Sequence, residues 1–320
     1  MIRMFRNIAV ALVLALLLGL VAPGAQAADR LRVAKPSAID FYFAIQEVGI
    51  AQKIFAKSGV DIETITLDGS AKQHQAMTAG SADIALGAGP DMGFIAKGAP
   101  EKAVAVMAGP PVNMYVLVAA KTGIKSVEDL KGKRMGVSTM GSLTYWLATQ
   151  LSRHQGWGDA GFQIIPMGNI QAEAAAFVSG NLDAAVASLE GGLNLEAKGQ
   201  ARLLTSFGDM VGPFLVHVFF ATNDMMTKRP DVLRRYLKSW FETVAYAKSH
   251  RDDTIRITRE TTRLSPEHAE KVYDVIVPTL ADAGHFDPKA VEIVLKSLVD
   301  LGQVEKAPDA KSLYTEEFLN

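Results

Sequence analysis

The chain has 320 residues, no cysteine, an apolar fraction of 49% and a formal net charge of −1. This length suggests about two domains, and the apolar content is sufficient for a buried core. Balanced charge argues against a nucleic-acid surface or a polybasic membrane patch, and the lack of cysteine excludes thiol nucleophiles, disulfides and cysteine-ligated metal centres.

The N-terminal residues have the pattern of an export signal. Arg3 and Arg6 precede an uncharged, apolar run over residues 8–22, and a small-residue site ends at Ala27. This is the layout of a secretory signal peptide, whereas the alternative, an uncleaved anchor, needs an apolar run of about 20 residues. We therefore expect residues 1–27 to be removed by cleavage after Ala27 and the mature protein to be periplasmic.

The residues that follow predict two α/β units in succession. Each unit is expected to alternate three strands with two helices, an order that predicts a parallel sheet. In the first unit we expect strands at 31–34, 60–65 and 84–86 and helices at 39–55 and 72–78. In the second we expect strands at 135–137, 162–166 and 184–187 and helices at 142–155 and 171–179.

Matching helix-to-strand junctions indicate that the two units are alike. Gly80 and Gly180 fall where a helix end needs a left-handed residue. Asp83 and Asp183 each follow that glycine by three residues and precede a buried strand. The recurrence of this pattern at the same place predicts two similar lobes.

Two apolar extended segments, 112–120 and 214–222, enter and leave the second unit and predict a two-strand hinge. The pattern after residue 222 is helical, and we expect these extra C-terminal helices to pack on the first lobe. Lobe 1 is therefore expected to comprise residues 28–118 and 219–320, and lobe 2 residues 119–218.

The sequence contains no recognisable catalytic motif. It has no G-x-S-x-G nucleophile elbow, P-loop or H-E-x-x-H pair, and its six histidines lack the spacing of metal ligands. The glycines at 87, 89 and 93 resemble a dinucleotide-binding turn, but the last is one residue late and Pro90 removes a backbone N–H. We therefore predict a protein without catalytic residues, metal or cofactor.

Candidate binding residues lie in loops at the carboxyl ends of the predicted strands, where open α/β sheets bind ligands. In residues 138–144, hydroxyls and a glycine open a helix, so free N–H groups there could hold an acceptor group. Ordinary helix capping by Ser142 or Thr139 explains the same pattern, and Ser70 admits both interpretations.

Three acids, Asp40, Asp91 and Glu190, also lie in strand-end loops. If all three face one cleft, the ligand carries an amine, a guanidine or a protonated ring nitrogen. The alternative is that they are solvated loop acids. His217 lies between apolar neighbours and is interpreted as a buried core histidine.

Residues 123–137, GIKSVEDLKGKRMGV, resemble the type II periplasmic solute-binding proteins of ABC importers. The resemblance is to the nitrate/sulfonate/taurine-like branch, which includes thiamine-precursor binders, and segments 41–55, 79–85 and 141–147 support it. It implies two lobes that close on one small-molecule ligand and present the closed form to an inner-membrane permease. We expect a monomer with no nucleic-acid partner.

The implied ligand is a small polar organic solute, either sulfonate/taurine-like or bearing an amine or pyrimidine. The alternatives are a thiamine-precursor pyrimidine binder or enzyme on the same fold, and an extracytoplasmic ligand sensor. Position by position, the loops and the resemblance place ligand contacts at Ser37, Asp40, Phe41, Gly69, Ser70, Gly89, Pro90, Asp91, Ser138, Thr139, Gly141, Ser142, Asn169 and Glu190. Relatives often have a proline directly after the acid, whereas here Glu190 precedes Gly191, which leaves its role open.

Overall fold

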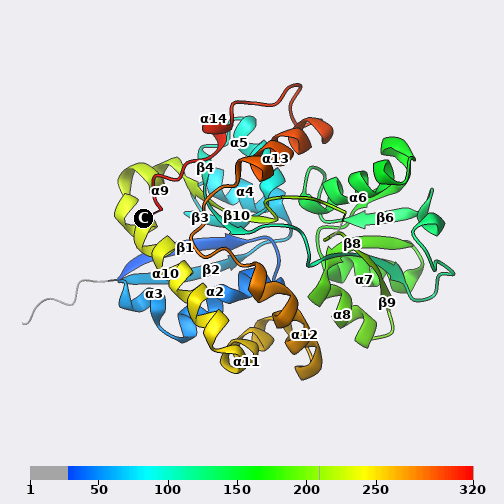
Figure 1. The fold of residues 1–320 in the computed structure, drawn as a ribbon, viewed down its shortest axis with the longest axis horizontal. Coiled ribbons are helices and arrows are strands. Elements are labelled where there is room, and N and C mark those ends of the chain that lie inside the picture. Colours follow the sequence, from blue (N-terminus) through cyan, green and yellow to red (C-terminus); the bar gives the residue numbers. More distant parts are fainter. Residues whose placement is uncertain (1–27, 209, 320) are drawn as a thin grey trace, which may run out of the picture.

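The computed structural model describes residues 28–208 and 210–319, so the predicted signal peptide lies outside the described part of the chain. Two lobes lie side by side, each with one five-stranded sheet covered by helices (Figure 1). No helix within the described ranges is long and apolar enough to span a membrane.

The first sheet has the strand order β2-β1-β3-β10-β4, in which only β10 runs antiparallel to its neighbours. Its strands are β1 (Asp29–Lys35), β2 (Val60–Thr66), β3 (Ile84–Gly87), β4 (Glu101–Ala108) and β10 (His217–Thr222). The helices between them are α2 (Phe41–Ala51), α3 (Ile54–Lys57), α4 (Ser70–Thr78) and α5 (Met92–Ala96). The single helix expected over 39–55 is two helices, because Lys53 has a left-handed backbone with φ of 58°.

The second sheet repeats this plan with the order β7-β6-β8-β5-β9, and its antiparallel strand is β5. Its strands are β5 (Met114–Ala119), β6 (Arg134–Val137), β7 (Gln163–Pro166), β8 (Ala184–Ser188) and β9 (Ala201–Ser206). Its helices are α6 (Leu143–His154), α7 (Ile170–Ser179) and α8 (Leu189–Ala197). The prediction of two similar lobes with mainly parallel sheets is confirmed.

The repeated Gly-x-x-Asp pattern has the same structural basis in both lobes. Gly80 and Gly180 have positive φ, and the aspartate that follows binds an arginine of the neighbouring strand. Asp83 accepts hydrogen bonds from the Arg32 backbone N–H at 2.9 Å and from its guanidinium at 2.7 Å. Asp183 accepts the equivalent bonds from Arg134, at 3.0 and 2.6 Å. The carboxylate thus joins the two parallel strands at the start of each sheet.

We expect Asp183→Ala to lower the free energy of unfolding by about 2 kcal/mol, because it removes the acceptor of both a backbone N–H and a guanidinium. Asp183→Asn should cost less, since its amide oxygen still accepts the backbone bond. Asp83→Ala should match Asp183→Ala, because the geometry is the same. Urea denaturation measures all three values, and wild-type stability of Asp183→Ala would contradict the prediction.

The chain crosses between the sheets twice, first after β4 and again after β9. All of β5 pairs with β8 and β9, so residues 114–118 belong to the second sheet rather than to lobe 1 as expected. Conversely, β10 starts at His217 and pairs only within the first sheet. The two crossings are joined to each other, since the Val216 N–H donates to the Gly109 carbonyl at 2.8 Å.

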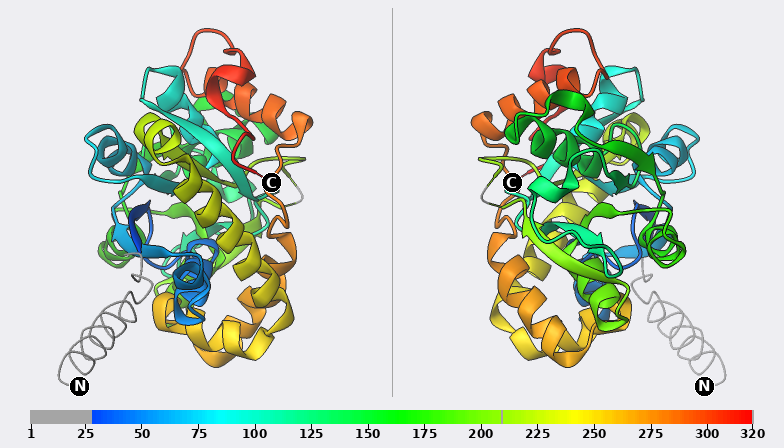
Figure 2. Two further views of the ribbon diagram at one scale, coloured as in Figure 1. Left: turned by 90° about the vertical axis from the view of Figure 1, so that its left-hand side faces the viewer. Right: turned by 90° about the vertical axis from the view of Figure 1, so that its right-hand side faces the viewer.

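The C-terminal part is helical, as expected, and covers the first lobe (Figure 2). Its helices are α9 (Asn223–Lys228), α10 (Pro230–Ser249), α11 (Arg251–Thr262), α12 (Pro266–Ile276), α13 (Pro288–Asp300) and α14 (Ala310–Leu313). Helices α10 and α11 pack on α2. Fully buried Trp240 of α10 meets Phe219 of β10 edge to face, with ring centroids 4.8 Å apart.

This C-terminal part also contacts the second lobe, which the sequence did not predict. Asp300, at the end of α13, pairs with Arg153 of α6 at 2.8 Å. The Gln303 amide donates to the Gly141 carbonyl at 2.6 Å, and a side chain at either Gly141 or Gly93 would collide with it. Gln303 thus lies between glycines of the two lobes.

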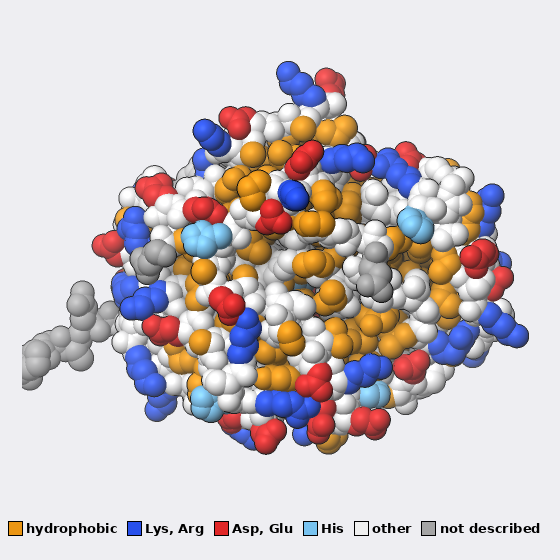
Figure 3. Space-filling view, in the orientation of Figure 1, with side chains coloured by type: hydrophobic (Ala, Val, Ile, Leu, Met, Phe, Trp, Pro, Cys, Tyr) orange, Lys and Arg blue, Asp and Glu red, His pale blue; other side chains and the backbone are white. Residues whose placement is uncertain are grey.

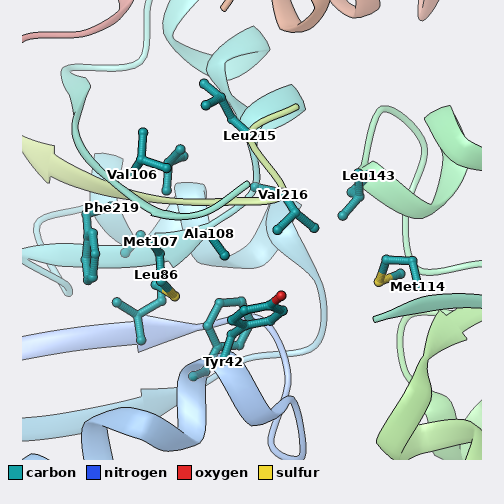
Figure 4. Packing of buried hydrophobic residues seen from close by; sticks show 14 of the residues in the cluster. Tyr42, Leu86, Val106, Met107, Ala108, Met114, Leu143, Leu215, Val216 and Phe219 are labelled. Atoms are coloured by element: carbon teal, nitrogen blue, oxygen red, sulfur yellow. The ribbon is translucent and has the colours of Figure 1, made fainter. Parts of the chain in front are cut away.

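Charged side chains of both signs are interspersed on the face seen in Figure 3, and hydrophobic side chains gather toward its middle. In the interior, Met114 and Leu143 of the second lobe lie opposite Val216 of the first (Figure 4). All three are buried. Apolar packing is therefore continuous from one lobe to the other beside the crossings.

Candidate functional site

A cavity of about 160 Å³ lies between the lobes, and both lobes contribute to its wall. It is located where the carboxyl ends of strands β1, β3, β6 and β8 meet, as expected for open α/β sheets. Of the residues predicted from the sequence, those that line it are Ser37, Asp40, Gly69, Ser70, Ser138, Ser142 and Asn169.

Helix N-termini surround the cavity, and in several of them a side chain caps one N–H group. Ser142 accepts the Tyr145 N–H at 3.3 Å, and Asn169 accepts the Ala172 N–H at 2.9 Å. By contrast, α4 begins after Gly69, which has φ of 84° and no side chain to cap the helix. The uncapped N-terminus of α4, with the Ser70 hydroxyl, therefore offers donors to an acceptor group.

The hydroxyls at the start of α6 form a compact cluster. The Ser138 hydroxyl lies 3.0 Å from both the Ser142 and Thr144 hydroxyls, which are 2.9 Å apart. Ser142 caps the helix and also lines the cavity, so the two interpretations of this motif are compatible. Ser138 lines the cavity without capping a helix, which makes it the cleaner probe of ligand contact.

Gly89, Pro90 and Asp91 lie behind the cavity wall rather than on it. The Gly89 N–H donates to the Leu215 carbonyl at 3.0 Å, and a Cβ on Gly89 would lie 2.6 Å from the same oxygen. Asp91 is fully buried and accepts the Ala88 N–H at 2.8 Å. These residues bind the second crossing and stabilise a turn. Ligand contacts also lie in strand-end loops, so the sequence alone does not separate the two roles.

Asp91 also belongs to a buried cluster with His74 and Glu101. His74 Nδ1 lies 2.6 Å from a Glu101 carboxylate oxygen, and His74 Nε2 lies 3.6 Å from Asp91. Burial alone would lower the pKa of His74, but the nearby Asp91 carboxylate and the hydrogen bond to Glu101 raise it to about 9. The cluster joins α4, the turn before α5 and the start of β4.

Three further predicted residues do not line the cavity. The Phe41 ring is fully buried in the core of the first lobe. Thr139 packs against Gly69, and the Gly141 carbonyl accepts the Gln303 amide. Each of the three is next to a cavity residue in the chain. Whether a side chain in such a pair points into the cavity or away from it cannot be read from the sequence.

Glu190 does not line the cavity but connects the lobes next to it. Its side chain is fully buried at the start of α8, and one carboxylate oxygen accepts the Phe41 N–H of α2 at 2.7 Å. Burial, together with the nearby Asp40 carboxylate, raises the pKa of Glu190 to about 8. A group of lobe 2 thus caps a helix of lobe 1.

Among the cavity residues that were not predicted as ligand contacts, two have strongly buried ionisable side chains. His217 is buried, as expected, but it also lines the cavity, with Nδ1 3.3 Å from the Gly87 carbonyl and Nε2 3.8 Å from Asp40. Burial lowers the pKa of His217 and raises that of Asp40. The T-shaped contacts of Tyr42 and Phe43 hold the imidazole in place.

The second is Glu173 of α7, whose side chain is 3% exposed. Glu173 lines the cavity, and one of its carboxyl oxygens is buried without a hydrogen-bond partner. Burial raises the pKa of Glu173 to about 8. In the sequence, Glu173 is an acid in the first turn of a helix. The helix dipole stabilises an acid at this position, so nothing in the sequence pointed to a ligand site.

Across residues 28–208 and 210–319, no three His, Asp or Glu side chains are grouped so that they could hold a metal ion. The polar residues around the cavity instead offer hydroxyls, carboxyls, side-chain amides, an imidazole and backbone N–H groups. Such a set can bind an organic solute through hydrogen bonds and charge.

The fold is that of periplasmic binding proteins. The chain belongs to the NMT1/THI5-like family, whose model matches residues 41–254. It is 25% identical to a binding protein of Brucella abortus over 257 residues, which cover 78% of this chain and 77% of that protein.

Two solved structures place the fold. The alkanesulfonate-binding protein SsuA from Xanthomonas axonopodis pv. citri, bound to MOPS, aligns with a TM-score of 0.75 and 18% identity, covering 89% of this chain and 98% of that one. The desulfurization enzyme DSZB aligns with a TM-score of 0.65 and 15% identity, covering 91% of this chain and 97% of that one. The predicted type II periplasmic-binding-protein fold is thereby confirmed, and the same fold also carries an enzyme.

Proposed function

We propose that this chain is the periplasmic substrate-binding component of an ABC importer, which captures one small polar organic solute between its lobes. The observation that carries the proposal is the cavity of about 160 Å³ whose wall comes from both lobes. A ligand that contacts both lobes at once binds the closed form better than the open form, and so stabilises closure. The closed form is then the one offered to a membrane permease.

The polar groups of the wall suggest how such a solute is held. The uncapped N-terminus of α4, with Ser70, donates to an acceptor group on the side of lobe 1. The hydroxyl of Ser138 supplies a contact from lobe 2. The Ser138 proton is donated to Ser142, so the Ser138 oxygen is open to a donor of the solute, and a solute with both an acceptor and a donor links the two lobes.

A binding role is favoured over catalysis. A crystal structure of DSZB is that of a mutant in which serine replaces a cysteine, whereas this chain has no cysteine at all. The cavity hydroxyls of Ser138, Ser142 and Thr144 bond to one another and to backbone groups, and none bonds to a histidine that could activate it. If the purified protein converted a bound solute into a product, the proposed function would be catalysis rather than binding.

We expect Ser138→Ala to weaken solute binding about tenfold, because one hydrogen bond from lobe 2 is lost. Its apo melting temperature should stay within a degree or so of wild type, since Ser138 caps no helix. Ser142→Ala is the matched control and should cost about 1 kcal/mol of apo stability through loss of the cap.

The solute for this test comes from a thermal-shift screen of the mature chain against sulfonates, amines and pyrimidines, since binding raises the melting temperature. The affinity of the best compound is then measured by calorimetry for each variant. Unchanged affinity in Ser138→Ala, with stability losses equal to those of Ser142→Ala, would show that these hydroxyls only support the helix.

The transport role has its own test. Deletion of the gene should abolish uptake of the identified solute, and cell fractionation should place the protein in the periplasm. Normal uptake in the deletion strain, with loss of a transcriptional response to the solute, would favour the sensor alternative.

A further inference from the structure

The cavity contains carboxyl groups from both lobes and, among the described residues of its wall, no lysine or arginine. Asp40 enters it from the start of α2 in lobe 1, and Glu173 from the first turn of α7 in lobe 2. The buried Lys35, at the end of β1, is outside the wall and pairs with Glu47 at 3.6 Å. The charged side chains of the wall are therefore acidic, apart from an imidazole.

Glu173 has no protein partner among the described residues for one of its carboxyl oxygens. That oxygen is buried without a hydrogen bond, and burial is the cause of the raised pKa of Glu173. Leaving a polar group buried and unpaired costs free energy. A ligand group that binds this carboxyl oxygen between the lobes recovers that free energy.

Asp40 has a hydrogen-bond donor for one carboxyl oxygen but no lysine or arginine beside it in the described wall. One carboxylate oxygen accepts the Tyr42 N–H at 3.0 Å, and the other lies 3.8 Å from His217 Nε2. The His217 Nδ1 faces the Gly87 carbonyl and therefore donates to it. Because burial lowers the pKa of His217, the imidazole is neutral at pH 7, and its Nε2 is a bare acceptor without a partner in the described part of the chain.

On the basis of the proposed binding function, we infer that the solute carries a positively charged nitrogen, as an amine, amidinium or guanidinium, and that Glu173 and Asp40 determine this specificity. In the ligand-free protein, burial raises the pKa of Glu173 to about 8, so this carboxyl holds a proton at pH 7, and burial also raises the pKa of Asp40 above its ordinary value. A bound cation favours the ionised carboxylates instead, and binding then releases protons to the buffer.

Helix N-termini favour anions, and this is the main argument for a sulfonate. Here one N–H group at the start of each of α6, α7 and α8 is already bound by a capping side chain, from Ser142, Asn169 and Ser188. A simple anion would meet the Glu173 carboxyl without an opposing cationic side chain in the described wall. The uncapped α4 can hold an acceptor group of the same solute, so a cation with a polar acceptor end satisfies both sides.

The test uses calorimetry on the mature full-length chain with probes of one shape and three charges, namely benzamidine, benzamide and benzenesulfonate, and with butylamine against butanesulfonate. We expect each cation to bind at least tenfold more tightly than its neutral or anionic counterpart at pH 7. The heat of cation binding should vary with the ionisation enthalpy of the buffer, because protons are released.

Glu173→Gln keeps the size of the side chain and removes its charge. We expect it to weaken benzamidine binding about thirtyfold, as for loss of one partner of a buried charge pair, and to abolish most of the proton release. Asp252→Asn is the control, because Asp252 lies outside the cavity wall and its side chain is 99% exposed; its effect should be below about twofold. Apo melting temperatures show whether each variant is folded.

The outcomes separate the two proposals. Tighter binding of benzenesulfonate or benzamide than of benzamidine overturns the cation assignment and leaves the binding function intact. The same holds if neither cationic probe binds while another class of compound from the screen does. If no small molecule raises the apo melting temperature, the proposed binding function itself fails.

Discussion

Glu190→Ala is expected to open the two lobes and to lower solute affinity about thirtyfold. The substitution removes the only side-chain acceptor seen for the Phe41 N–H in the described residues, at a buried contact between α8 and α2. Loss of a buried hydrogen bond with an orphaned donor costs about 2 kcal/mol, which lowers the population of the binding-competent closed form. Small-angle scattering of the apo protein should show a larger radius of gyration.

Glu190→Gln is the matched control, because its amide oxygen still accepts the Phe41 N–H. The pKa of Glu190 is raised to about 8, so the carboxyl is neutral at pH 7 and glutamine resembles it closely. A raised acid pKa contributes stability that is complete below its ordinary value and declines as pH rises toward 8.

The ligand-free wild-type protein should therefore be more open at pH 9 than at pH 6, and Glu190→Gln should lack this contribution. Asp40 faces Glu190, so the variant Asp40→Asn should also reduce the opening at high pH. Identical scattering of Glu190→Ala and wild type at both pH values would contradict a role in holding the lobes together.

The second large effect concerns stability at high pH and depends on His74. Its pKa of about 9 lies above the ordinary value of 6.5, because the Asp91 and Glu101 carboxylates outweigh the effect of burial. For a histidine with a raised pKa, the stabilisation is complete below pH 6.5 and is lost as pH rises through 9. We expect the free energy of unfolding to fall by about 3 kcal/mol over this range.

His74→Gln should lose a similar amount at pH 6.5, because it leaves two buried carboxylates without a positive partner. Its unfolding free energy should then lack the decline between pH 6.5 and 9. His285→Gln is the control, since that histidine is 61% exposed. A decline of wild-type size in His74→Gln, measured by urea denaturation, would assign the pH dependence to other groups.

The sequence was most informative where a local pattern has one structural cause. Gly80 and Gly180 need a left-handed conformation, and the aspartates three residues later tie neighbouring strands together, so their recurrence predicted two like lobes correctly. The lobe boundaries were less accurate. An apolar extended segment such as 112–120 does not reveal which sheet it joins, because that depends on partners far away in the chain.

The same limit applies to the site. Strand-end loops identified the cavity, yet Asp40 lines it while Asp91 is buried behind it, although both are acids at the start of a helix. Their difference is one of side-chain direction, which packing decides. Glu173 was missed because an acid in the first turn of a helix is ordinary.

Gln303 has a consequence for how long a solute stays bound. Its amide is held between Gly93 and Gly141, and neither it nor the nearby Asp300–Arg153 pair lines the cavity. These contacts must break whenever the lobes separate, so they slow the escape of a solute that they never touch. Residence time can therefore be tuned from the C-terminal segment, while the chemistry of recognition stays unchanged.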